Sequence, residues 1–171
     1  MLIRFHKGRD VDVLTCIRPD GSTTWNRLGP RSLPIAHDLI HYAVETTLGL
    51  RNAFFGLVAG GWDITTFAER GAARRLPPEA VQVEFLVGQL QSELLGPQSD
   101  EATFLATLRQ SFTNAGVTAL EITPEQLGQV RSRARELLDR WRALPVGESF
   151  ELSFGNSAAE GSRLQDTEDA N

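Results

Sequence analysis

The sequence predicts a single α+β domain, residues 1–155, in which a small antiparallel sheet packs against about five helices. The chain before residue 29 alternates apolar and polar side chains, and a short alternating stretch returns near residue 150. Between them, apolar residues recur with the period of an amphipathic helix. The 171 residues, 41% of them hydrophobic, suffice for one core, and no linker separates two.

Four strands are expected, three at the N-terminal end and one near the C-terminal end. The runs 2–6 and 11–18 alternate, and residues 7–10 provide a tight connection between them. The Pro-Asp-Gly sequence at 19–21 predicts a turn, after which 23–28 supplies the third strand. Phe150, Leu152 and Phe154 alternate with polar residues, so this last strand is expected to join the N-terminal sheet.

The helices are delimited by their start and stop residues. Gly49 ends the first helix, and Thr123 with Gln126 forms a capping-box pattern that begins the last one. Beyond Gly155 the chain is polar and carries a net charge of −3, which predicts a disordered acidic tail over 156–171. The expected helices cover roughly 33–48, 53–60, 77–94, 101–114 and 125–144, with a further piece over 63–71.

Composition excludes several classes of protein. The net charge of −5 argues against a nucleic-acid binder, and the longest apolar run is too short for a membrane span. The single cysteine, Cys16, excludes an intramolecular disulfide, and no secretory signal is visible, so a cytoplasmic location is expected. The arginines of the last helix divide between two flanks, with Arg133 and Arg140 on one of them. That split is more typical of side chains around a buried edge than of a phosphate-binding face.

Potential chemistry concentrates on the first helix, where His37 and His41 lie four residues apart and Glu45 follows after four more. Residues at this spacing share one helix face, so His37, His41 and Glu45 are the candidate metal ligands, with a divalent ion such as zinc as the cofactor. One ion is not expected to reach all three, because residues eight apart are about 12 Å apart along the axis. A pair would recruit a third ligand from elsewhere: His6, Asp63, Glu69 or Glu84.

On a helical wheel, His37 borders the apolar stripe, His41 lies on its flank, and Glu45 points away from it. Asp38 is a candidate pocket residue, although a carboxylate near a helix start also suits the helix dipole. Trp62 and Asp63 are further candidates for a pocket mouth, the alternative being a buried tryptophan beside a helix-capping aspartate.

The order His-Asp-x-x-His resembles the His-Glu-x-x-His of zinc peptidases at four positions. It differs at the general base, where Asp38 is one methylene shorter, and no further peptidase signal follows. A longer pattern, Pro-x-x-His-Asp-Leu-x-His-x-x-Val-Glu over 34–45 with Leu-Gly-Leu at 48–50 and Phe-Gly at 55–56, resembles a group of small bacterial proteins of unassigned function. That resemblance covers about residues 34 to 61. It implies a bacterial origin and nothing about a reaction.

Three interpretations of the histidine helix stay open: a metal site, a metal-free polar site, and hydrogen-bonding residues at a layer boundary. No catalytic residue is assigned. The alternative function is a non-catalytic interaction protein that binds a partner or forms a homo-oligomer through its helical layer. A pocket that holds both histidines and another carboxylate would favour the metal site. A solvent-facing His41 without a third ligand would favour the interaction protein.

Overall fold

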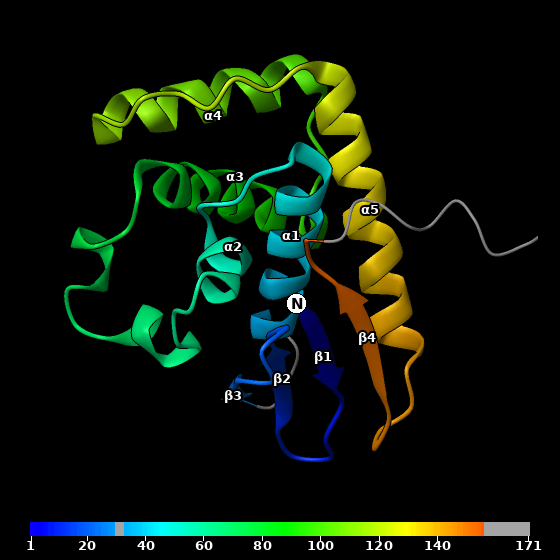
Figure 1. Cartoon of the computed structure of the whole chain (residues 1–171). Coiled ribbons are helices and arrows are strands. Elements are labelled where there is room, and N and C mark those ends of the chain that lie inside the picture. Colours follow the sequence, from blue (N-terminus) through cyan, green and yellow to red (C-terminus); the bar gives the residue numbers. More distant parts are fainter. Residues whose placement is uncertain (30–32, 156–171) are drawn as a thin grey trace, which may run out of the picture.

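The computed structural model describes residues 1–29 and 33–155, so the predicted disordered tail lies outside the described residues (Figure 1). Its four strands form one antiparallel sheet in the order β3-β2-β1-β4. The three N-terminal strands and the C-terminal strand confirm the predicted α+β fold. The strands are β1 (Leu2–His6), β2 (Asp12–Ile17), β3 (Thr23–Leu28) and β4 (Ser149–Ser153).

One face of the sheet is buried because apolar residues meet in register across the strands. Ile3 pairs with Cys16 on one side and with Leu152 on the other, and all three are buried. Phe5 pairs with Phe150, and their rings stack with centroids 5.3 Å apart. Such cross-strand pairs fix the register, because a shift by one residue would turn the apolar set toward solvent.

The helices begin and end where the local signals predict. Gly49 adopts a φ of 70° after the first helix, and Thr123 and Gln126 form the predicted capping box. The predicted piece over 63–71 contains one short 3-10 turn, in keeping with the β-branched Ile-Thr-Thr run at its start, and a second 3-10 turn follows it. The helices are α1 (Leu33–Leu48), α2 (Phe54–Ala59), α3 (Pro78–Leu95), α4 (Glu101–Ala115) and α5 (Pro124–Ala143), and the turns are η1 (Ile64–Ala68) and η2 (Ala72–Arg74).

Helix α1 lies at the centre of the helical layer, in contact with α5, α3 and α2 (Figure 1). His41 is therefore only 2% exposed and Glu45 is fully buried. The prediction that His41 lies on a flank and that Glu45 points away from the core was wrong in this respect. A helical wheel treats the side opposite the apolar stripe as exposed to solvent, whereas neighbouring helices cover that side of α1. Among the described residues, no helix has the length and hydropathy needed to span a membrane.

The arginines of α5 lie on different sides of the helix and contact different elements. Arg131 is buried, and its Nη2 donates to Glu93 Oε2 of α3 at 2.7 Å. Arg133 and Arg140 lie beside β4, in the wall of a separate pocket. A buried ion pair of this kind fixes how α5 sits on α3, because removing one partner would strand the other charge in the core.

Candidate metal centre

Two helices bring three potential metal ligands to one point. His37 and His41 come from consecutive turns of α1, and Glu84 comes from α3, which packs against it. The Nε2 atoms of the two histidines are 3.1 Å apart. Oε1 of Glu84 lies 3.2 Å from Nε2 of His41, and Oε2 of the same carboxylate lies 3.6 Å from Nε2 of His37. Three donors from two elements therefore converge on a single small volume.

These separations fit the edge lengths of a coordination polyhedron. A tetrahedral zinc ion with bonds of about 2.0–2.1 Å requires neighbouring donors roughly 3.3–3.4 Å apart. One face of an octahedron with similar bonds requires roughly 3.0 Å. The two nitrogens are 3.1 Å apart, and each lies 3.2 or 3.6 Å from a different oxygen of Glu84, close to these values. With one ligand atom taken from each residue, the three donors lie within 4.8 Å of one another, close enough for them to hold one ion.

The other nitrogen of each histidine faces an acceptor. Nδ1 of His37 lies 2.9 Å from the side-chain oxygen of Gln91, which can only accept, so Nδ1 carries the proton and the Nε2 lone pair is free. Nδ1 of His41 lies 3.3 Å from Oε1 of Glu45. Its geometry is not that of an aligned hydrogen bond, and the buried Nδ1 has no other partner. An acceptor that is hydrogen-bonded to a metal-binding histidine fixes its tautomer and raises the basicity of its ring, and Gln91 has this position behind His37.

Glu45 is itself held in place by the start of α2. Its two carboxylate oxygens accept hydrogen bonds from the backbone amides of Phe55 and Gly56, at 3.2 and 3.0 Å. The approach of this segment requires glycine at position 56, because a Cβ atom there would lie 2.1 Å from the carbonyl oxygen of Arg51. Glu45 therefore acts behind His41, with its oxygens engaged by backbone, instead of joining the three donors that converge.

Without a metal ion, a proton occupies the point where the donors meet. Burial alone would lower the pKa of His41, but Glu45 and Glu84 overcome that effect and raise it to about 9. For Glu84, burial is likewise outweighed, and its hydrogen bonds to His37 and His41 hold its pKa well below the usual range. The carboxylates around His41 thus favour one positive charge at this point, which a proton supplies in the metal-free protein.

A pocket of about 250 Å³ opens beside the three donors. Both histidines, Asp38 and Glu84 lie in its wall, so the pocket contains two carboxylates beside the histidine pair. Burial raises the pKa of Asp38 to about 7, although the nearby histidines oppose this shift. The remaining wall is mainly apolar, from Leu14, Leu28, Phe54, Ile64, Phe67 and Ala68, with the amide of Asn26 among them.

The other predicted residues have different roles. Asp63 caps η1 by accepting from the amide of Thr65, and Trp62 packs against Phe67, so neither contributes to the wall of this pocket. Of the four residues considered as third ligand, His6 bonds to Ser149 and Glu69 pairs with Arg75.

Glu84 alone among those four meets the histidines. Sequence reasoning missed Gln91. The available signal was that Glu84 and Gln91 are polar residues two turns apart on one face of a largely apolar helix.

Comparisons with protein-family models, with curated proteins and with solved structures found no match to this chain.

Proposed function

We propose that this protein binds one divalent transition-metal ion, zinc in the first instance, through Nε2 of His37, Nε2 of His41 and the carboxylate of Glu84. The observation that carries the proposal is the convergence of these three donors at coordination distances from one another. Two imidazoles and one carboxylate form a ligand set found in catalytic zinc sites and, with octahedral geometry, in iron(II) sites.

Two features of the surroundings support a metal ion in preference to a structural hydrogen-bond cluster. Acceptors stand behind both rings, Gln91 behind His37 and Glu45 behind His41, so that both Nε2 atoms face the same point. The nitrogens would otherwise compete for a single proton in a site where His41 is almost fully buried. A cation removes that competition because it accepts both lone pairs.

The proposed ion keeps at least one coordination position open. Three protein ligands are one fewer than a closed tetrahedral site contains, and the adjoining pocket of about 250 Å³ leaves room for water or a small ligand. The apolar wall that includes Phe54 and Phe67 suits a small molecule with an apolar body and one oxygen or nitrogen donor. The ion is therefore proposed to be of the reactive kind, with the chemistry at that open position.

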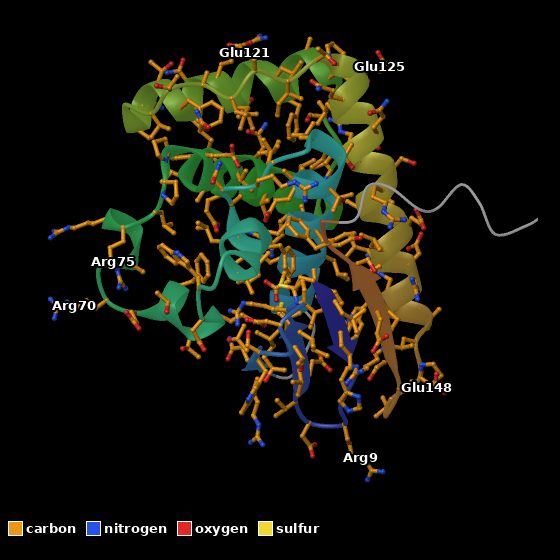
Figure 2. All side chains as sticks on the ribbon, viewed as in Figure 1. Arg9, Arg70, Arg75, Glu121, Glu125 and Glu148 are labelled. Carbon is orange, nitrogen blue, oxygen red and sulfur yellow. The ribbon has the colours of Figure 1, made fainter. Side chains whose placement is uncertain are left out.

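Metal content of protein purified without a histidine tag, followed by zinc titration of chelator-treated protein, tests this proposal. We expect one ion per chain for wild type and a loss of affinity of at least about 100-fold for Glu84→Gln and for His37→Ala. Glu121→Gln is the matched control, because Glu121 is exposed beside the α4–α5 connection and the charge change is the same (Figure 2). Equal zinc affinity in wild type and Glu84→Gln would refute the ligand assignment.

Cobalt(II) substitution tests the open position separately. The visible absorption of bound cobalt reports its coordination number, and it should change when imidazole or azide is added to the wild-type complex. A spectrum that ignores both additives would mean that the site is closed and structural, even if the ligand assignment holds.

A further inference from the structure

A second pocket, of about 580 Å³, lies between α5, the C-terminal half of α1 and β4. It shares no wall residue with the histidine pocket. Three arginines from two parts of the chain line this pocket: Arg51 from the segment after α1, and Arg133 and Arg140 from α5. The sequence divided the arginines of α5 between two flanks, and the flank with Arg133 and Arg140 is joined in the fold by Arg51, about 80 positions away.

Two of these arginines stack on aromatic rings and have no charged partner in the described part of the chain. The Cζ atom of Arg140 lies 4.4 Å from the ring centroid of Phe150, and that of Arg51 lies 5.2 Å from the centroid of Phe154. Within residues 1–29 and 33–155, neither guanidinium forms an ion pair or a side-chain hydrogen bond. Stacking on an aromatic face uses the π surface of a guanidinium and leaves its N–H edge free to bind.

The other charges in this pocket cancel locally. Glu151 pairs with Arg4, with Oε1 and Nη2 2.6 Å apart. Arg133 donates two hydrogen bonds of 2.8 Å to the carboxylate of Glu136. Counted over the residues that the structure describes, Arg51 and Arg140 therefore leave a charge of about +2 in a concave site.

The position of Arg51 is fixed by backbone contacts. The amides of Arg51 and Asn52 donate to Oε1 of Glu79 at 2.9 and 2.5 Å, which ties this segment to α3. Thr47 and Gln129 add neutral polar groups to the same wall. Because the backbone at Arg51 is held in place and both guanidiniums stack on aromatic rings, ordering these side chains around an anion costs less than ordering free ones.

We propose that this pocket binds a small dianionic ligand whose charge resides on oxygen atoms, either a phosphate monoester or a dicarboxylate. The charge of the ligand follows from the two uncompensated guanidiniums, and the preference for oxyanions follows from their fork of N–H donors. The volume lies in the range of pockets for small metabolites. This inference does not depend on a metal ion in the histidine site.

The experiment is an NMR titration of the full chain, with ¹⁵N-labelled arginine side chains, at constant ionic strength. The probes are inorganic phosphate and succinate as dianions and acetate as a monoanion. We expect saturable shifts of the Arg51 and Arg140 Nε–H signals, with a millimolar or tighter Kd for at least one dianion and weaker binding of acetate. The tighter of the two dianions identifies the ligand as a phosphate or a dicarboxylate.

The variants separate a site from general attraction. Arg51→Gln with Arg140→Gln should weaken dianion binding at least about tenfold, whereas Arg9→Gln with Arg70→Gln changes the net charge equally and should leave it within about twofold. Arg9 and Arg70 extend from the β1–β2 turn and from the end of the η1 region, both at the periphery (Figure 2). Arg51→Lys with Arg140→Lys retains the charges and the aliphatic part of the side chains, so its affinity for the dianion should lie between those of wild type and the double glutamine variant. Absence of saturation by either dianion, equal binding of acetate, or equal weakening in the two glutamine pairs would overturn the proposal.

Discussion

The raised pKa of His41 predicts how zinc affinity depends on pH. Glu45 and Glu84 overcome the effect of burial and raise this pKa to about 9, so the metal-free protein carries a proton on His41 at neutral pH. Zinc must displace that proton before Nε2 can donate its lone pair. Each pH unit below the pKa therefore weakens binding by about 1.4 kcal/mol, which is about tenfold in Kd. Between pH 9 and pH 7 the expected loss is roughly 100-fold, and above pH 9 the affinity should level off.

The assay is zinc titration against a competing chelator from about pH 7.5 to 9.5, with calorimetry at about pH 8 in two buffers of different ionisation enthalpy. Roughly one proton should be released per zinc ion bound. Asp38, whose pKa burial raises to about 7, would release a second proton near neutral pH, so the titration is repeated in Asp38→Asn. A Kd that stays constant from pH 7.5 to 9, with no proton released in either protein, would show that zinc does not bind His41.

Three further predictions concern stability. Burial raises the folded-state pKa of Asp38 from 3.8 to about 7, so the folded protein holds this proton more tightly and loses stability as pH rises from 4 to 7. In urea unfolding, the metal-free Asp38→Asn variant should therefore have the same free energy of unfolding as wild type near pH 4 and a higher one above pH 7, by at most about 4 kcal/mol. If the variant differs from wild type by the same amount at both pH values, burial of Asp38 is not the cause. Gly56→Ala should cost about 3 kcal/mol and weaken zinc binding by displacing Glu45, whereas Gly60→Ala, whose Cβ would meet its nearest atoms at 3.4 Å, should cost under about 1 kcal/mol by thermal or urea denaturation. Ending the chain after Gly155 should leave the melting temperature nearly unchanged, because residues 156–171 contain few apolar anchors, and a loss of several degrees would show that the tail docks.

Local signals predicted most of the fold. The glycine stop at Gly49 and the capping box at Thr123 depend on residues within one turn, and both helix ends lie where these signals indicated. The alternation at the two ends of the chain predicted one sheet, and the register of β1 with β4 bears this out. The 3-10 turns of η1 and η2 were missed because a short segment contains too few residues to distinguish helix types.

The site was predictable only as far as it is local. The His37–His41 pair is visible because a helix brings residues four apart together. Glu84 lies 43 residues beyond His41, and its proximity depends on how α3 packs on α1, which no local pattern specifies. The burial of His41 and Glu45 was missed for the same reason. A helical wheel describes one helix without the neighbours that cover it.

The position of β1 between β2 and β4 has a consequence for synthesis of the chain. The second edge of β1 is completed only by β4, in which Ser153 pairs with Leu2. At ribosomal rates of about 5–20 residues per second, that edge waits on the order of ten seconds for its partner. During this interval Ile3 and Phe5 lie beside an open row of backbone donors and acceptors, which invites pairing with another nascent chain. A chain that ends before Glu148 lacks β4, so the edge of β1 stays unpaired. Premature termination should therefore yield insoluble protein instead of a smaller folded one.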